Sequence, residues 1–565
     1  MNNLKTNIMK FNKKIKWLLI GLSLFFSGIL MAQNRTISGV VSSADDGLPL
    51  VGVTVIEKGT NNGTVTNNDG QYNIAVSSPN SILQFSMVGM ENVEEKVGNR
   101  KIIDVRMSPS TVLLDQIVVT GYTTEKKADL TGAVSVVDVK DMMSESGNNP
   151  MLALQGRVAG MSVTADGNPS GAATVRIRGI GTMNNNDPLY VIDGVPTKGG
   201  MHELNSNDIE SIQVLRDASA ATIYGSRAAN GVIIITTKQG EKGKTIVNFD
   251  SYLTLSQYGK TVEMMNTKQY GESLWQAMIN SGYDPNANGI GYMYSYSYDD
   301  NGNPKLDDML VPKYLVDGTK RMLSSNTDWF DAITRTGEAQ SYNLSVSNGT
   351  DKGNKFFSLG YYDNKGTIEQ TYFNRISARM NSDYKLLDDL VTIGENFSLN
   401  KTSELQAPGG VLDLALMALP IMPVKTVDGD WSSVTSGMLD RDNPARVLDA
   451  NRDNPYSYWR LFGNTYIDIQ PIKNLHFKSS FGVDYGNYYQ RILTYSYTGR
   501  LGEGLKNASQ IVQNHFMKWT WSNVANYQFK IKRHRMDFLA GTEFNKETDI
   551  SFSSKKEDYE IENPN

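Results

Sequence analysis

The sequence has no cysteine, only four histidines and a single long apolar run, which lies near its start. Without cysteine, the chain can hold no disulfide, no thiolate nucleophile and no cysteine-bound metal. A net charge of −5 argues against a nucleic-acid-binding surface. The histidines are too scattered to form a metal-ligand pattern; they are His202, His476, His515 and His534.

Several short motifs approach catalytic or metal-binding patterns and then depart from them. The run Gly240–Thr245 lacks a glycine that a phosphate-binding loop needs, and a strand rather than a helix is expected after it. The run Gly179–Asn184 lacks the third glycine of a dinucleotide site. Ser226 lacks the glycine spacing of a nucleophile elbow, and Asp284–Gly289 has no closing glutamate for calcium. We therefore expect no catalytic residue, no cofactor and no metal.

Residues 1–32 have the features of an export signal. A basic segment precedes the apolar run Trp17–Leu30, and Ala32 supplies the small residue that signal peptidase prefers. We expect cleavage after Ala32. The alternative is an uncleaved membrane anchor, although the run is shorter than the ~20 residues of a spanning helix. The basic residues are Lys10, Lys13, Lys14 and Lys16.

Residues 33–109 read as an all-β domain. Short alternating segments are separated by turn dipeptides such as Asp46-Gly47 and Asp69-Gly70. About seven strands in such a length predict a small β-sandwich. The clearest strands are expected at Arg35–Val41, Gly52–Glu57, Gln71–Val76, Ile82–Met87 and Ile102–Met107.

Residues 125–243 mix strands with short helical pieces, which predicts an α/β domain. Apolar runs bounded by glycine and aspartate indicate buried strands at Leu189–Ile192, Ile209–Leu215 and Val232–Thr236. Further strands are expected at Ala133–Val139, Val163–Ala165 and Thr174–Arg178, and helical pieces at Asp141–Ser146, Met151–Ala159 and Ala218–Tyr224.

From residue 244 to 565 the pattern changes to regular alternation. In one segment Ile376 and Met380 alternate with Arg375, Ser377 and Arg379. One face of such a strand suits lipid and the other suits water, which is typical of an outer-membrane barrel. We count nine or ten strands, with short charged turns at one end and two long inserts, Asn266–Asp331 and Gln406–Arg460, at the other. The whole chain is therefore expected to be mainly β.

Two runs, Thr174–Pro196 and Ile209–Gly240, resemble the plug domain of TonB-dependent outer-membrane transporters, in particular the SusC/RagA branch. Local patterning alone would also suit a small soluble α/β domain. The resemblance implies that a plug fills a barrel and that the following residues form the plug signature: Arg176, Arg178, Gly179, Gly181, Asp193, Gly194, Arg216, Asp217, Tyr224, Gly225, Arg227 and Gly231.

The same resemblance assigns roles to the segments before the plug. Residues 33–109 are similar to a carboxypeptidase-regulatory-like domain, which implies a periplasmic module without catalytic residues. Residues 110–124 resemble the linker that carries a TonB box, a segment that binds TonB by strand addition. The TonB-box residues would be Gln116, Ile117, Val118, Val119 and Thr120. The alternative is that these residues form the first strand of the plug.

Two further expectations concern the plug itself. The resemblance implies that arginines such as Arg176 and Arg178 pair with acidic residues of the barrel wall; a solvated charged face is equally consistent with the sequence. The loop of Asn184, Asn185, Asn186 and Asp187 is our candidate for the plug surface that faces substrate, and a plain surface loop is the alternative.

These features predict a TonB-dependent importer of a bulky nutrient, an oligosaccharide or a peptide, in the outer membrane of a Gram-negative bacterium. The implied partners are TonB with ExbB-ExbD, a SusD-like surface lipoprotein and outer-membrane lipid, with no nucleic acid. The alternative is a binding or signalling receptor with little transport. Because a plugged transporter barrel closes with about 22 strands, we expect residues 244–565 to form only the N-terminal part of the barrel.

Overall fold

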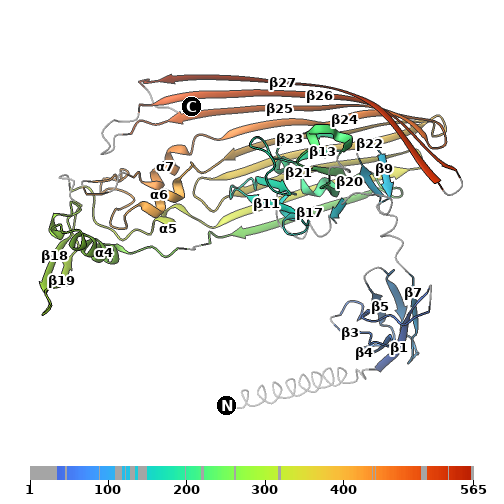
Figure 1. The fold of residues 1–565 in the computed structure, drawn as a ribbon, viewed down its shortest axis with the longest axis horizontal. Coiled ribbons are helices and arrows are strands. Elements are labelled where there is room, and N and C mark those ends of the chain that lie inside the picture. The colour runs from blue at the N-terminus through green and yellow to red at the C-terminus, as the bar shows by residue number, and fades with distance from the viewer. Residues whose placement is uncertain are drawn as a thin grey trace, which may run out of the picture. The chain divides into compact units, whose positions relative to one another are not determined.

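The computed structural model describes residues 35–44, 47–60, 62–87, 90–108, 117–120, 123–126, 134–137, 149–197, 199–217, 222–259, 262–315, 320–435, 437–438, 441–497, 506–531 and 534–560. The chain divides into a small N-terminal unit and a larger unit that holds the rest (Figure 1). The predicted signal peptide and Gln116 lie outside the described residues.

The N-terminal unit is a sandwich of two small sheets, as predicted. One sheet has the strand order β4-β1-β7 and the other β3-β2-β5-β6. Side chains at alternate positions of β1 and β4 point into a shared apolar core that includes Ile37, Val55 and Phe85. The strands are β1 (Arg35–Ser43), β2 (Thr54–Glu57), β3 (Gly63–Val65), β4 (Gln71–Val76), β5 (Ile82–Ser86), β6 (Val93–Lys96) and β7 (Val105–Met107).

Glu57 is the buried charge of this unit. Burial disfavours its ionised form, but hydrogen bonds from Ser81, Asn62 and Ser77 outweigh that cost and lower the pKa of the carboxyl from 4.5 to about 2. Its oxygens accept from Ser81 Oγ at 2.5 Å and Asn62 Nδ2 at 2.9 Å. The ionised carboxylate therefore stabilises the sandwich at neutral pH, and this contribution is lost as the pH falls toward 2.

Two short strands, β8 (Ile117–Thr120) and β9 (Thr123–Lys126), form a two-stranded sheet of their own. Four of the five predicted TonB-box residues make up β8. In the described part of the chain, β8 joins no strand of the plug sheet.

The plug region, defined here as residues 134–240, contains a five-stranded sheet with the order β10-β15-β16-β13-β14. The strands β13 and β16 are mostly apolar and almost wholly buried, so both faces of the sheet are covered there. A separate hairpin of β11 and β12 packs its Val163, Val175 and Ile177 into the same core. The strands are β10 (Val134–Val137), β11 (Met161–Ala165), β12 (Ala173–Ile177), β13 (Leu189–Ile192), β14 (Val195–Thr197), β15 (Ile209–Leu215) and β16 (Val232–Thr237).

Of the helical predictions for the plug, the one that lies wholly within the described residues was wrong. Met151–Ala159 forms only a 3-10 turn, η3 (Leu152–Leu154), followed by further turns. Most of the predicted helix at Ala218–Tyr224 lies outside the described residues, and a 3-10 segment, η6 (Thr222–Ala228), is kinked at Gly225. The predicted helix at Asp141–Ser146 is also outside them. The other 3-10 helices are η4 (Met201–Glu203) and η5 (Ser206–Asp208). The hairpin of β11 and β12 stays separate from the main plug sheet.

The rest of the larger unit is dominated by a nine-stranded sheet, called the wall below, in which every neighbouring pair is antiparallel. Figure 1 shows the plug elements against the middle of this sheet. The strands are β17 (Ile246–Ser256), β20 (Gly337–Thr350), β21 (Gly353–Lys365), β22 (Tyr372–Leu386), β23 (Val391–Leu405), β24 (Tyr456–Ile472), β25 (Leu475–Thr494), β26 (Ala508–Ile531) and β27 (His534–Glu557).

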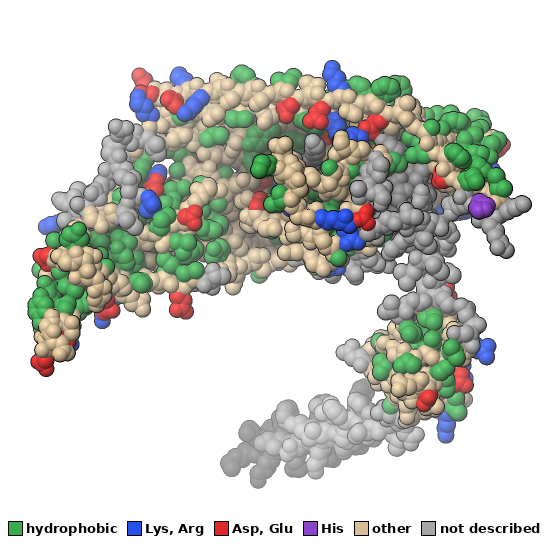
Figure 2. Space-filling view, viewed as in Figure 1, with side chains coloured by type: hydrophobic (Ala, Val, Ile, Leu, Met, Phe, Trp, Pro, Cys, Tyr) green, Lys and Arg blue, Asp and Glu red, His purple; other side chains and the backbone are tan. Residues whose placement is uncertain are grey.

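The two long inserts of the wall fold together into one lobe. They share an apolar core in which Trp275 and Tyr292 of the first insert join Ile421 and Leu448 of the second. Hydrophobic side chains also gather on the surface of this lobe (Figure 2). None of the described helices is long and apolar enough to cross a membrane. The elements of the lobe are α4 (Thr267–Asn280), η7 (Pro285–Ala287), β18 (Met293–Tyr298), β19 (Pro304–Leu310), α5 (Trp329–Ile333), α6 (Val411–Met417) and α7 (Pro444–Asn451).

The wall inverts the burial pattern of a water-soluble sheet. In β22, Ser377 and Arg379 are 3% and 2% exposed, whereas Ile376 and Met380, on either side of this pair, are 56% and 48% exposed. The polar face lies under the plug and the apolar face points outward. This arrangement confirms the predicted alternation, and it is the one expected where the outer face meets hydrocarbon.

Candidate functional site

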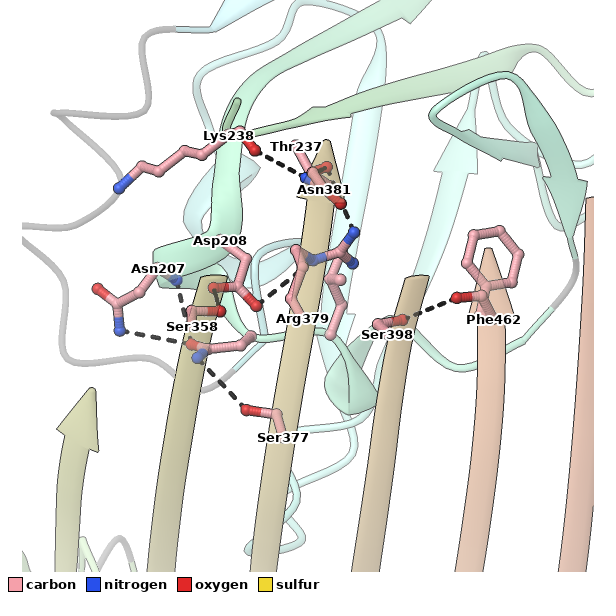
Figure 3. A network of polar contacts seen from close by, with 12 residues as sticks. Asn207, Asp208, Thr237, Lys238, Ser358, Ser377, Arg379, Asn381, Ser398 and Phe462 are labelled. Carbon is pink, nitrogen blue, oxygen red and sulfur yellow. Dashed lines mark hydrogen bonds and ion pairs between the residues drawn. The ribbon is translucent and has the colours of Figure 1, made fainter. Parts of the chain in front are cut away.

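The polar face of the wall holds the plug through buried arginines. Arg379 of β22 lies between two plug carboxylates, with Nη1 3.4 Å from Asp193 Oδ2 and Nε 3.5 Å from Asp208 Oδ2. Asp208 also accepts a hydrogen bond from Ser358 Oγ at 2.6 Å. Figure 3 shows Arg379 reaching from its strand toward this part of the plug. Two acids around one guanidinium anchor this part of the plug.

A second buried cluster surrounds Arg460 of β24. Its guanidinium donates to Glu203 of the plug at 2.9 Å, to Thr197 of the plug at 2.7 Å and to Asp484 of the wall at 2.9 Å. Thr197 Oγ1 in turn donates to Asp484 at 2.6 Å. The cation therefore has one acid from the plug and one from the wall beside it, so neither acid is buried without a counter-charge.

The third arginine, Arg375, binds backbone instead of carboxylate. Its Nη1 donates to the carbonyl oxygens of His202 at 2.7 Å and Leu204 at 3.0 Å. Uncharged residues extend this contact between the plug and the wall, which is called the seam below. Asn205 donates to Asn343 at 2.8 Å, and Asn381 donates to the Lys238 carbonyl at 2.7 Å. Most of these contacts come from two plug segments, 193–208 and 237–239.

Among the described residues, Arg176 and Arg178 do not pair with acidic residues of the wall. Each pairs with an acid of the plug itself, Arg176 with Asp187 and Arg178 with Asp217. At Arg379 and Arg460 the charge arrangement is the reverse of our expectation, because the cation lies on the wall and an acid lies on the plug. Arg227 of the plug, in contrast, pairs with Glu543 of the wall at 2.8 Å, as the resemblance implied for plug arginines.

A pocket of about 720 Å³ opens beside the candidate loop. Its lining combines amides and hydroxyls with apolar side chains, and its two charged residues, Asp187 and Arg227, have partners in Arg176 and in Glu543 of β27. Burial, reinforced by the charge of Asp187, raises the pKa of the Tyr190 phenol, which therefore remains protonated. The polar lining includes Asn149, Thr174, Thr182, Asn184, Asn185, Ser226 and Asn230.

The four loop residues differ in their roles. Asn184, Asn185 and Asp187 line the pocket, whereas Asn186 is buried and holds the loop together. Asn186 Oδ1 accepts from the backbone N–H groups of Gly181 at 2.8 Å and Thr182 at 2.9 Å, and its amide donates to the carbonyls of Thr182 and Asn184. The loop is therefore a fixed shape that displays its other side chains.

Comparisons with known proteins agree with this geometry. The family model described as the TonB-dependent receptor plug domain matches residues 126–232, and the CarboxypepD_reg-like domain matches residues 37–119. The TonB-dependent receptor SusC of Bacteroides thetaiotaomicron is 30% identical over 512 residues, which is 84% of this chain and 47% of that protein. The chain is a homologue of the SusC-type TonB-dependent receptors.

Further matches support the same relationship. A TonB-dependent receptor of Formosa agariphila is 31% identical over 533 residues, covering 93% of this chain and 47% of its own length. A solved structure described as the RagAB peptide importer in its open-open state superposes with a TM-score of 0.62 at 25% identity, covering 79% of this chain and 50% of that one. The chain thus spans about half the length of the curated relatives it matches. The proteins that it matches are named as receptors and importers, not as enzymes.

Several residues of the predicted plug signature serve backbone geometry. Asp193 (φ 49°) and Gly194 (φ 85°) form the tight turn between β13 and β14, where positive φ values suit a two-residue hairpin. Arg216 donates to the Ala159 carbonyl at 2.6 Å, and Tyr224 is buried. Gly179, Gly225 and Gly231 also have positive φ, whereas Gly181 is the exception and lines the pocket.

Sequence reasoning named Asp193 but missed the other residues that carry the seam. Arg375 and Arg379 were noted only as polar members of an alternating strand, and Arg460 was assigned to the end of a long insert, whereas the structure places it in β24. Glu203 and Asp208 were not singled out. A signal was present, because Arg375 and Arg379 lie on the same face of one strand. On a strand whose other face meets lipid, such charges need partners on the inner side.

Proposed function

We propose that the protein imports a bulky nutrient, an oligosaccharide or a peptide, across the outer membrane of a Gram-negative bacterium in a TonB-dependent manner. The observation that carries this proposal is a wall with an apolar outer face whose polar inner face holds a plug through buried ion pairs. The plug keeps the lumen closed, and opening it requires work, since the buried pairs must be broken.

The segment Gln116–Thr120 is the proposed attachment point for TonB. Its backbone from Ile117 onward is already extended in β8 and pairs only with β9 among the described strands. A short two-stranded sheet is easily opened, and an extended segment can then add to the exposed sheet edge of a partner. TonB, powered through ExbB-ExbD, would pull on this segment and remodel the plug.

The proposed capture step uses the pocket beside the loop of Asn184, Asn185 and Asp187, together with a SusD-like surface lipoprotein. A concave polar pocket of this volume suits part of a bulky nutrient. The likeness to SusC and to the RagAB structure supports a two-protein arrangement.

The test separates capture from transport. Deleting Gln116–Thr120 should abolish uptake and leave binding of nutrient at the cell surface intact, since the pocket lies in a different part of the chain. Uptake in the deletion strain would be compared with uptake in a strain lacking TonB and in one lacking the lipoprotein. Uptake at the normal rate in the deletion strain would refute the TonB-box assignment, and normal uptake without TonB would refute the proposed mechanism.

A further inference from the structure

One edge of strand β12 carries backbone groups that no described strand uses. Thr174 and Arg176 of β12 direct their backbone groups toward the partner strand β11. The same alternation continues beyond the strand ends, where Asp166 N–H donates to the Ala172 carbonyl and Arg178 N–H donates to the Gly160 carbonyl. In an antiparallel pair, the residues between these positions turn their N–H and C=O groups away from the partner. Ala173 and Val175 therefore direct their backbone groups to the open edge.

This open edge leads into the pocket. Ala172, Ala173 and Thr174 line the pocket, whereas farther along the strand the Val175 carbonyl accepts a hydrogen bond from Arg176 Nη1 at 2.8 Å. The N–H and C=O of Ala173 thus remain available on the pocket side. An exposed sheet edge of this kind pairs with an extended peptide through main-chain hydrogen bonds.

The loop beside the pocket suits a peptide in a second, independent way: Gly181 and Thr182 line the pocket, and Ile180 and Met183 flank these two residues in the sequence without lining the pocket themselves. Ile180 and Met183 are 80% and 105% exposed, although the loop that bears them is held by Asn186. A fixed loop that presents isoleucine and methionine to solvent offers packing for aliphatic side chains, and methionine adapts to many of them. Among the described lining residues Tyr190 is the one phenylalanine, tyrosine or tryptophan, and it is buried.

We propose that the pocket takes an uncharged, extended segment of a peptide whose backbone pairs with the Ala173 edge of β12 and whose apolar side chains pack on Ile180 and Met183. This inference rests on the proposed function and narrows its cargo to peptides. The neutral amides and hydroxyls of the lining supply the remaining hydrogen bonds to peptide groups.

The decisive variant is Ala173→Pro. Proline removes the N–H that the peptide would accept from, and it is tolerated here because Ala173 is the first residue of its strand and donates no bond to β11. Ala165→Pro is the matched control. Ala165 is the cross-strand neighbour of Ala173 at the end of β11, its N–H also points away from the hairpin, and it does not line the pocket.

The measurement uses the purified chain in detergent with two probes, a random synthetic hexapeptide library and a mixture of neutral malto-oligosaccharides. Retained species are identified by mass spectrometry. We expect the wild type and Ala165→Pro to retain hexapeptides rich in apolar residues. Ala173→Pro should retain these peptides in an amount at least about tenfold lower. Replacing Ile180 and Met183 by asparagine should remove the apolar preference from the retained peptides.

Equal retention by Ala173→Pro and the wild type would overturn the edge pairing, and retention of oligosaccharides in place of peptides would overturn the choice of cargo. Because this assay needs neither TonB nor a membrane, its result is independent of the uptake test. Peptides retained by a protein that fails to import them would refute the proposed transport and leave this inference standing.

Discussion

Arg379 reaches from β22 to Asp193 and Asp208, and all three side chains are less than a tenth exposed. Such a cluster is costly to assemble, since three charges leave water, but it is costlier to break, since the remaining charges are then buried alone. The cluster therefore fixes the orientation of the plug, which can pack against the wall only with its acids opposite the arginines. Neighbouring charges that stay in water, such as Arg178 with Asp217, make no such demand.

Replacing Arg379 by glutamine should loosen the plug in the wall. The change leaves Asp193 and Asp208 without their cation, at a cost of about 3–5 kcal/mol. The expected result is faster hydrogen–deuterium exchange and faster proteolysis in the plug segments 193–208 and 237–239 of the whole chain.

Arg178→Gln is the control for this change, because it removes an arginine of the plug whose side chain is 59% exposed. Its effect should stay below about 1 kcal/mol. Equal exchange in the two variants would contradict the idea that the buried wall arginine anchors the plug.

The strands of the plug differ in how firmly they are held. β16 lies between β15 and β13 and is buried along its length, whereas β10 is an edge strand joined to β15 by four residue pairs. β10 is also the described plug strand nearest in sequence to β8, the proposed attachment point for TonB. A pull from that direction would meet the least resistant strand first.

We expect the amides of β10 to exchange with solvent at least about tenfold faster than those of β16 in the resting protein, because edge strands open locally without unfolding the core. Hydrogen–deuterium exchange with mass spectrometry would measure both strands in one experiment. Equal protection of β10 and β16 would show that the edge strand opens only together with the core of the plug.

The two faces of the wall have different surroundings. The inner face contacts the plug, and in the proposed location the outer face contacts lipid. Because the two faces alternate residue by residue, a shift of one residue in strand register would place arginines against hydrocarbon. The ion pairs of the seam and the apolar outer face therefore enforce the same register.

Ile376→Lys tests this arrangement on the outer face of β22, where the side chain is 56% exposed. A lysine facing the middle of a bilayer should destabilise the folded protein by roughly 2–4 kcal/mol. Urea titration of the protein folded in lipid vesicles would measure the loss, with Ile376→Leu as the control. A lysine variant as stable as the leucine variant would show that this face does not meet lipid.

Local sequence determined much of this protein. The strands Leu189–Ile192 and Ile209–Leu215 were predicted at the bounds that the structure has, and so was the alternation of the wall. Strand period, turn residues and buried apolar runs are set by near neighbours in the chain, so they can be read from it directly. The resemblance of two runs was enough to indicate the family.

Tertiary structure alone decided which charges meet. Arg460 and Glu203 are 257 residues apart, and Arg379 and Asp193 are 186 apart. No local pattern distinguishes a wall arginine that pairs with the plug from a plug arginine that pairs with its own loop. The open edge of β12 is likewise defined by what fails to pair with it in space. Such contacts depend on how distant segments pack, because the energy of a charge or an unpaired backbone group is set by its surroundings and not by its neighbours in sequence.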